Sequence, residues 1–401
     1  MTKHLRAIGK QFVADLLAHA QVVVPRERHW SEMLIDSRTL ATSSFNRRWL
    51  IKGLLVADQP GVIGGAKKML KTSIMIAMAI SMASGKAFLK KFDVPEKMRV
   101  AVFSGESGDS TIQETAKRIC ESMKVDLSTL DILWGFDLPQ LGKSEELGHL
   151  GKLIREKEIK VIFIDPLYLC LLGGRTDVSP SNLFQMGPLL KEIAKVCLDA
   201  GATPLLVHHC TMGSGKKKSN PDLSDLSFAG IQEFVRQWVM IGRRNAFVPG
   251  SGRHDLCLQV GGSAGQSGEW PLTIREGRLA EDFTGRYWKT SFPTSEDLAD
   301  ERKSRSQNKA REELRKNCKK VIQVLKKHPD GETKSVIFRH AKLNSINGGE
   351  ALERLERRRE VERCDIEKKG RSHPAYRLVA NNGNAAVDRH ERKHDKKGGK
   401  G

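Results

Sequence analysis

Hydrophobic positions in this 401-residue chain change their spacing along its length, and the changes predict where one kind of structure gives way to another. From Trp49 to about Arg275, short unbroken runs of Val, Ile and Leu alternate with amphipathic stretches. Such runs are typical of strands buried on both faces of a parallel sheet, with helices packed over them. The predicted strands are Leu54–Val56, Gly61–Ile63, Val100–Ser104, Ile132–Trp134, Val161–Asp165 and Pro204–His208. The predicted helices cover about residues 72–84, 110–123, 144–156 and 183–200.

Three later apolar runs have no helical pattern between them. They are Trp238–Ile241, Leu256–Val260 and Leu272–Ile274. Strands joined without crossover helices predict antiparallel pairing, here at one edge of the sheet. We therefore predict that residues 46–290 form an α/β domain with a parallel central sheet and antiparallel edge strands.

The regions on either side of this domain have different patterns. Residues 1–45 are mixed and polar, and we expect an extension that packs on the core. Residues 291–310 carry no apolar pattern and predict a linker. The next part predicts a small α+β domain of the winged-helix type, since three helices precede a β-hairpin. Its predicted parts are a basic helix at 311–327, helices at 334–340 and 348–359, and a hairpin between 361 and 380, followed by a disordered basic tail at 381–401.

The segment between the Gly61–Ile63 strand and the helix after it carries the most specific chemistry. Compared with the pattern G-x-x-x-x-G-K-[ST], it matches at Gly65, Lys71 and Thr72. In such a phosphate loop, backbone N–H groups face an anion, the lysine neutralises the outer phosphates and the hydroxyl holds Mg²⁺. We therefore predict a nucleoside triphosphate site, for ATP with Mg²⁺. Its predicted residues are Gly64, Gly65, Ala66, Lys67, Lys68, Met69, Leu70, Lys71, Thr72 and Ser73.

One position departs from the pattern, because Leu70 stands where the loop has its second glycine. Glycine there lets the backbone approach phosphate without a Cβ in the way. Leucine fits only if its side chain points away, into the packing between helix and sheet. The departure at Leu70 weakens the prediction of ATP hydrolysis more than the prediction of ATP binding. The neighbouring Lys67 and Lys68 add positive charge to the loop.

Carboxylates at the ends of two predicted strands complete the candidate site. Asp165 ends a buried run and would support Mg²⁺ opposite the Thr72 hydroxyl. Glu106 follows the Val100–Ser104 strand and is the candidate to polarise the attacking water. Asp109 is a weaker alternative, since helix capping explains it. A third strand ends at the histidine pair of residues 208 and 209, one of which could sense the γ-phosphate.

This set of residues resembles the RecA-type ATPase core of the RepA-like replicative helicase family, within the RecA and DnaB group. The resemblance covers about residues 45–275 and includes two further segments, Arg48–Leu55 and Ser227–Trp238. It implies that Lys71 and Thr72 contact phosphate and Mg²⁺, and that Asp165 supports Mg²⁺. It further implies that Glu106 is the catalytic base and His209 the sensor.

The same resemblance implies a homo-oligomeric ring, such as a hexamer, in which an arginine of one subunit completes the neighbour's site. Arg236, Arg243 and Arg244 are the candidates. We take Arg243, after the Trp238–Ile241 strand, as the catalytic one, although one sequence does not choose among the three.

The distribution of charge points to a polyanionic partner. The net charge is +20, and residues 301–401 alone hold 29 Lys and Arg against 15 Asp and Glu. Such an excess favours nucleic acid, while a solubilising surface is the plainer interpretation. We expect single-stranded DNA in the ATPase core and duplex DNA at the winged helix. The predicted contacts are Lys216, Lys217 and Lys218 in a glycine-rich loop, Arg354, Arg357 and Arg358 in the last helix, and Lys368 and Lys369 in the hairpin turn.

These features predict an enzyme that hydrolyses ATP to handle DNA, of the helicase or replication type. A nucleotide-gated DNA-binding regulator with little turnover is the alternative, and a small-molecule kinase is a third, for which no acceptor motif is visible. The seven cysteines are scattered without a C-x-x-C pair. A disulfide framework is therefore not indicated, no apolar run is long enough for a membrane span, and we expect a cytoplasmic protein.

Overall fold

A computed structural model describes residues 30–172, 178–210, 221–280, 284–368 and 370–379. The chain forms two compact units. The first contains the residues up to Trp270 and Ile274–Thr290, and the second contains Pro271–Thr273 and the residues from Ser291 onward. Each unit is considered by itself.

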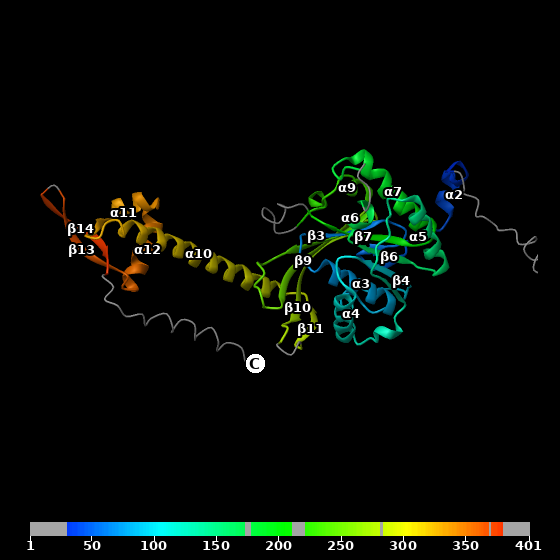
Figure 1. Ribbon diagram of the computed structural model, residues 1–401, viewed down its shortest axis with the longest axis horizontal. Coiled ribbons are helices and arrows are strands. Elements are labelled where there is room, and N and C mark those ends of the chain that lie inside the picture. Colours follow the sequence, from blue (N-terminus) through cyan, green and yellow to red (C-terminus); the bar gives the residue numbers. More distant parts are fainter. Residues whose placement is uncertain (1–29, 173–177, 211–220, 281–283, 369, 380–401) are drawn as a thin grey trace, which may run out of the picture. The chain divides into compact units, whose positions relative to one another are not determined.

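A nine-stranded sheet forms the centre of the first unit (Figure 1), with strand order β11-β10-β9-β8-β3-β7-β6-β4-β5. The strands are β3 Gly61–Gly65, β4 Val100–Ser104, β5 Ile132–Gly135, β6 Val161–Asp165, β7 Thr203–His209, β8 Gln237–Arg243, β9 Arg253–Gly262, β10 Ser267–Gly277 and β11 Arg286–Ser291. The six strands from β8 to β5 pair in parallel, and β9 pairs antiparallel with β8. The predicted α/β fold, with a mostly parallel sheet and antiparallel strands at one edge, is confirmed.

The direction of β8 corrects the prediction. It was expected to be one of the antiparallel additions, yet it runs parallel to β3, with Gly61 opposite Gln237 and Gly65 opposite Ile241. Parallel neighbours need a crossover connection. The chain between β7 and β8, which includes the short helix α9 Ile231–Phe234, provides one. The antiparallel edge therefore begins one strand later, at β9.

Helices cover both faces of this sheet. On one face lie α3 Lys71–Ser84 and α4 Asp109–Met123; on the other lie α5 Ser144–Glu156, α7 Leu183–Asp199 and α9 (Figure 1). A short helix, α6 Leu167–Leu172, follows β6. Helix α3 has buried apolar residues on all sides because it lies between the sheet and α4. Helix α5 buries only the stripe of Leu147, Leu150 and Ile154.

The described part of the N-terminal extension does not pack as predicted. Residues 30–45 form a 3-10 turn, η1 Trp30–Met33, and a short helix, α2 Ser37–Thr42, that buries none of its residues. Leu34 is 73% exposed and Phe45 is 67% exposed. The apolar residues are too sparsely spaced to form a continuous stripe against the sheet. Residues 1–29 lie outside the described part. The chain enters the first unit through the antiparallel pair β1 Trp49–Ile51 and β2 Leu55–Val56.

The second unit contains three helices and a small sheet of order β12-β14-β13. Its elements are α10 Ser295–Leu325, β12 Glu332–Thr333, α11 Lys334–Ala341, α12 Ser345–Arg357, β13 Val361–Lys368 and β14 Arg371–Leu378. Val321, Leu325, Ile337, Leu352 and Leu355 belong to its hydrophobic core. Helices and hairpin follow each other in the predicted order.

The segment predicted as a linker, 291–310, is helical from Ser295 onward. A capping box begins this helix, with Thr294 and Asp297 each bonding the other's backbone N–H. An exposed helix needs no apolar stripe, which is why the pattern gave no sign of it. The tail predicted to be disordered, 381–401, lies outside the described residues.

Two absences apply to the described residues. None of their helices is both long enough and apolar enough to cross a membrane. All seven cysteines are free thiols, and six of them are buried.

Candidate active site

The phosphate loop begins where β3 is held most closely between its neighbours. A Cβ added to Gly65 would lie 2.8 Å from the carbonyl oxygen of Ile241, and one added to Gly64 would overlap the Met240 side chain. Both glycines are therefore required by the packing of β3 against β8. The chain leaves the sheet after Gly65, turns, and enters α3 at Lys71.

Leu70 takes the backbone conformation that explains the usual glycine. It is the N-cap of α3 and has φ +58°, in the left-handed region, and Lys68 has φ +60°. A non-glycine residue there costs about 1–2 kcal/mol. Leu70 is half-buried. The loop thus keeps the shape of a phosphate loop at the cost of local strain.

Lys71 is a buried cation, only 6% exposed. Its Nζ donates to the Ala66 carbonyl oxygen at 3.0 Å and lies 2.9 Å from His209 Nδ1. Burial, the largest cause, lowers the pKa of Lys71. No carboxylate within the described residues forms a direct ion pair with this ammonium, so an anion entering the loop would meet an uncompensated charge.

Thr72 and Asp165 meet as predicted. The Thr72 hydroxyl donates to Asp165 Oδ2 at 2.6 Å. Asp165 is 3% exposed, and burial raises its pKa to about 6, against the hydrogen bond from Thr72 and the charge of Lys71, which lower it. A hydroxyl and a carboxylate in contact are the hard oxygen ligands that Mg²⁺ prefers. The donor set therefore fits Mg²⁺ beside the phosphate loop.

Glu106, His209 and Tyr168 continue the site from Lys71. His209 Nε2 lies 3.8 Å from Glu106 Oε2, while the other Glu106 oxygen accepts a hydrogen bond of 2.6 Å from Tyr168 OH. The hydrogen bond to Glu106 is the main cause that raises the pKa of Tyr168 to about 12. The order β3-β7-β6-β4 makes this possible, since β7, β6 and β4 end beside the phosphate loop. Lys71, His209, Glu106 and Tyr168 form one chain of contacts.

Tyr168 was missed by the sequence analysis. It lies in the first turn of α6, three residues after Asp165. A tyrosine next to a strand-end carboxylate carries no special pattern. Its significance follows only from the pairing of β4 with β6, which brings Glu106, after β4, to the phenol of Tyr168, after β6.

The two histidines at the end of β7 differ in role, because successive residues of a strand face opposite ways. His208 is 1% exposed, and its Nε2 lies 2.8 Å from Ser227 Oγ and 2.9 Å from the Ser227 carbonyl oxygen. Burial lowers the pKa of His208 to about 4. Ser227 Oγ in turn donates to the His209 carbonyl oxygen at 2.6 Å. His208 is thus a neutral support that fixes the backbone of His209.

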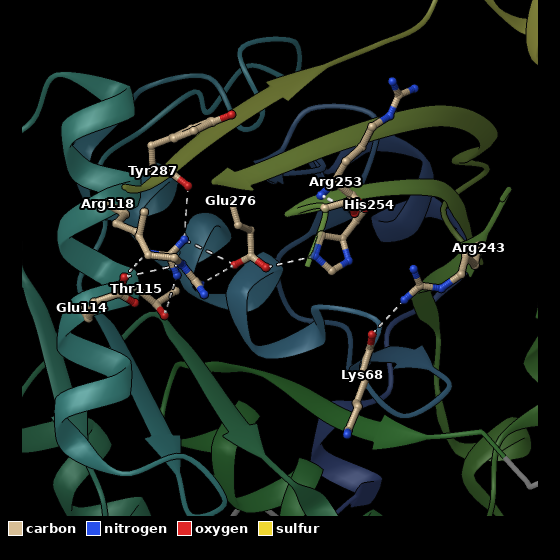
Figure 2. A network of polar contacts seen from close by, with 11 residues as sticks. Lys68, Glu114, Thr115, Arg118, Arg243, Arg253, His254, Glu276 and Tyr287 are labelled. Carbon is tan, nitrogen blue, oxygen red and sulfur yellow. Dashed lines mark hydrogen bonds and ion pairs between the residues drawn. The ribbon is translucent and has the colours of Figure 1, made fainter. Parts of the chain in front are cut away.

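The three candidate arginines all contact their own chain. Arg236 donates to the Glu233 carbonyl oxygen at 2.8 Å, and Arg244 donates to that of Leu256 at 2.8 Å. Arg243 Nη2 donates to the Lys68 carbonyl oxygen in the phosphate loop at 3.0 Å (Figure 2).

Arg243 is supported by a network that the sequence analysis did not foresee. Its guanidinium carbon lies 5.3 Å from the ring centroid of Phe247, which stacks on His254 at 4.9 Å. His254 Nε2 lies 3.1 Å from Glu276 Oε2, and the other Glu276 oxygen lies 3.3 Å from Arg118 of α4 (Figure 2). Contacts therefore run from the phosphate loop through the antiparallel edge to α4.

The predicted nucleic-acid contacts fall into two groups. Lys216, Lys217, Lys218 and Lys369 lie outside the described residues. Of the other four residues, Arg357, Arg358 and Lys368 form ion pairs with carboxylates of the second unit. Arg357 lies 3.6 Å from Glu353, Arg358 lies 3.8 Å from Glu360, and Lys368 lies 2.6 Å from Glu332. Arg354 is half-buried on α12.

Comparison with known proteins supports the coarse assignment. Residues 28–215 match the family model described as the AAA domain, a range that includes the phosphate loop, Glu106, Asp165 and His209. A solved structure, that of a KaiC-like protein from Pyrococcus horikoshii, is 13% identical with a TM-score of 0.40 over 60% of this chain and 93% of that chain. No curated protein matches. With the geometry above, the family match supports a RecA-like P-loop ATPase.

Proposed function

We propose that this protein is an ATP-hydrolysing, DNA-handling motor of the helicase or replication type. The observation that carries the proposal is the single contact network of Lys71, His209, Glu106 and Tyr168 beside the Thr72–Asp165 pair. A protein that only bound nucleotide would have no use for a carboxylate placed to activate water.

In the proposed reaction, water attacks the γ-phosphorus of ATP and Glu106 accepts the proton of that water. The bond from the γ-phosphorus to the ADP oxygen breaks, and ADP and phosphate leave. Mg²⁺, when held by Thr72 and Asp165, would neutralise charge on the phosphate oxygens. Lys71 leaves its contacts with Ala66 and His209 to bind phosphate, which couples arrival of ATP to the position of His209 and hence to Glu106.

We further propose that Arg243 acts within its own chain. Its hydrogen bond to the Lys68 carbonyl oxygen holds the phosphate loop in shape, and the stack on Phe247 holds the guanidinium in place. A ring assembly and completion of each site by a neighbour remain part of the proposal, with Arg236 and Arg244, both engaged in backbone contacts, as the alternatives.

DNA handling is proposed from charge and topology. The second unit has the helix, strand, helix, helix and hairpin order of a winged helix, and residues 301–401 carry the basic excess. We propose duplex DNA as its partner and single-stranded DNA as the partner of the ATPase unit, with replication or mobile-element maintenance as the setting.

The deciding experiment measures ATP turnover with and without single-stranded DNA, for the wild type and Lys71→Ala. The motor predicts turnover that DNA stimulates and that the variant loses. Strain at Leu70, with φ +58°, favours one rival: a nucleotide-gated DNA-binding regulator with little turnover. The rival predicts ATP-dependent DNA retention with negligible turnover in the wild type, a result that would overturn the motor.

A further inference from the structure

The second half of α10 has two opposite faces. One face carries Cys318, Val321, Val324 and Leu325, which are buried in the core of the second unit. Opposite it are five exposed lysines, which we name the lysine face: Lys316, Lys319 and Lys320 on the helix, and Lys326 and Lys327 directly after its last residue. Between residues 314 and 329 the sequence contains no Asp or Glu.

Within the part of the chain that the structure describes, no carboxylate neutralises the charges of the lysine face. None of the five ammonium groups has an ion pair or side-chain hydrogen bond with another residue in the described part of the chain. Like charges gathered at helical spacing repel each other, at a cost of a few tenths of a kcal/mol for each pair. A surface that keeps such charges unpaired is ready for an anionic partner.

The surface predicted to read DNA is different. On α12, Glu350 and Glu353 are exposed, and Glu353 pairs with Arg357. On the hairpin, Arg363 lies 2.7 Å from Glu356, and Arg377 lies 2.7 Å from Glu362. Lys368 is paired as well. Carboxylates therefore neutralise most of the cations that α12 and the hairpin present.

We propose that the lysine face of α10 is the main surface of the second unit that binds nucleic acid, through the phosphate backbone and without sequence preference. From Lys316 to the end of α10 at Leu325 the helix rises about 14 Å, a length over which duplex DNA carries about eight phosphates. The face has no aromatic residue to stack on bases, and its one amide, the exposed Gln323, lies among lysines that bind phosphate rather than bases. The inference deepens the proposed DNA-handling role.

An anionic membrane is a weaker partner for this surface. Helices that lie on membranes insert an apolar face between the lipid headgroups. The apolar face of this part of α10 is already occupied by α11 and α12. Phosphate groups on a nucleic acid need only the exposed lysines.

The test uses the full chain and a fluorescent 20-base-pair duplex, without ATP, between 50 and 200 mM KCl. The variant replaces Lys316, Lys319 and Lys320 by Ala, which favours helix and leaves the core untouched. A matched variant replaces three exposed lysines of the first unit by Ala: Lys90, Lys117 and Lys191. A third variant replaces Arg354, Arg357 and Arg358 by Ala.

We expect the α10 variant to bind more than tenfold more weakly at 100 mM salt. The slope of log affinity against log salt should fall by roughly 2.7, since each lost phosphate contact contributes about 0.9. The matched variant should bind like the wild type, and the arginine variant should lose less than the α10 variant.

Three results would overturn the proposal. One is a larger loss in the arginine variant than in the α10 variant; another is an equal loss in the matched variant. The last is binding to phosphatidylserine vesicles with no binding to the duplex. If the salt slopes are as expected but the protein does not turn over ATP, the proposed motor function is contradicted and the proposal for the lysine face is still supported.

Discussion

The edge of the first unit that holds Lys71, Thr72, Asp165, Glu106 and His209, which we call the buried edge, differs from the lysine face of the second unit. Both contain positive charge, but in one case it is buried and in the other it is exposed. Lys71 is 6% exposed and lies among Asp165, Glu106 and His209. The five lysines of α10 are exposed and unpaired within the described residues. A buried charge interacts strongly with a few fixed neighbours, whereas exposed charges act together through a field that salt screens.

This difference separates two kinds of function. At the buried edge, one altered group should abolish a chemical step, because the neighbours are left uncompensated. On the lysine face, each group should contribute a similar, modest share. The predictions below test that division, beginning with the largest effect.

Lys71→Ala is the most severe test of the buried edge. Removing the buried ammonium that lies next to Thr72 and interacts with Asp165 should reduce ATP turnover by on the order of 10²-fold or more. Affinity for Mg·ATP should fall as well. Phosphate release measures the first and displacement of a fluorescent ATP analogue the second.

The control for this variant is the same protein's duplex binding. Its salt dependence should match that of the wild type, because the lysine face is intact. Turnover within tenfold of the wild type would show that the loop does not hold the phosphates.

Glu106→Gln separates chemistry from binding at the same edge. The amide oxygen can still accept from Tyr168, but the group can no longer take a proton from water. We expect kcat to fall by about 10²-fold with ATP affinity within a few-fold of the wild type. Steady-state kinetics beside equilibrium binding make this distinction.

The rival base gives a comparison for this variant. Asp109 is the first residue of α4, and its Oδ1 accepts from the Ser110 N–H at 2.6 Å. Asp109→Asn should leave kcat within about twofold, since the N-cap of α4 is Gly108 and an amide oxygen at residue 109 accepts the same hydrogen bond from the Ser110 N–H. The assignment of Glu106 fails if Asp109→Asn is the more damaging change.

Arg243→Ala tests whether the buried edge is complete within one chain. We expect about tenfold weaker Mg·ATP binding, because the Lys68 carbonyl loses the donor that holds the loop. Arg278→Ala, at an exposed arginine directly after β10, is the matched control and should bind normally.

Mixing variants decides between action in cis and in trans. Arg243→Ala and Lys71→Ala subunits, combined in equal amounts, would restore turnover only if each intact arginine served a neighbour's site. We expect no recovery. Recovery to about a quarter of wild-type turnover, the share of sites with both groups intact, would establish action in trans.

The contrast also explains what the sequence could predict. Strands β3, β4, β6 and β7 were found within one or two residues because buried parallel strands are unbroken apolar runs. Thr72 and Asp165 were placed together because parallel strands end at one edge. The local pattern of apolar residues was therefore sufficient to predict these strands and the residues at their ends.

Features that depend on distant pairing were missed. The direction of β8 is set by its pairing with β3, which lies about 170 residues earlier in the chain. Strand β11 and the stacking of Phe247 on His254 have no signal in the local sequence. The helix over residues 295–310 did have a local sequence signal, a Thr-x-x-Asp capping box, but it had no apolar stripe. The role of Tyr168 depends on the pairing of β4 with β6, which brings Glu106 to it.

His208 gives a pH-dependent test of how the buried edge is supported. Its pKa is about 4 in the fold and about 6.5 when unfolded, so its contribution to stability is complete above pH 6.5 and is lost as pH falls toward 4. At pH 5 this loss is about 2 kcal/mol. His208→Gln keeps an N–H for Ser227 and has no proton to gain.

Urea unfolding at pH 7 and pH 5 measures the effect. All six tryptophans lie at or before residue 288, so their fluorescence follows the first unit. The wild type should lose about 2 kcal/mol more than His208→Gln between the two pH values. Equal losses would mean that His208 is not kept neutral by burial.

Tyr168→Phe is the mildest test, because Glu106 is 42% exposed and water can replace the phenol. In the wild type the hydrogen bond from Tyr168 holds the Glu106 carboxylate in position for water activation. Without this bond, kcat should fall about threefold while KM for ATP stays unchanged. Tyr168 is a positioning residue, and the split between kcat and KM distinguishes this from a structural role. In the Glu106→Gln background the same substitution should have almost no effect on turnover, since the group that Tyr168 positions is already disabled. If the two losses multiply instead, Tyr168 acts independently of Glu106, and the buried edge is less closely coupled than its contacts indicate.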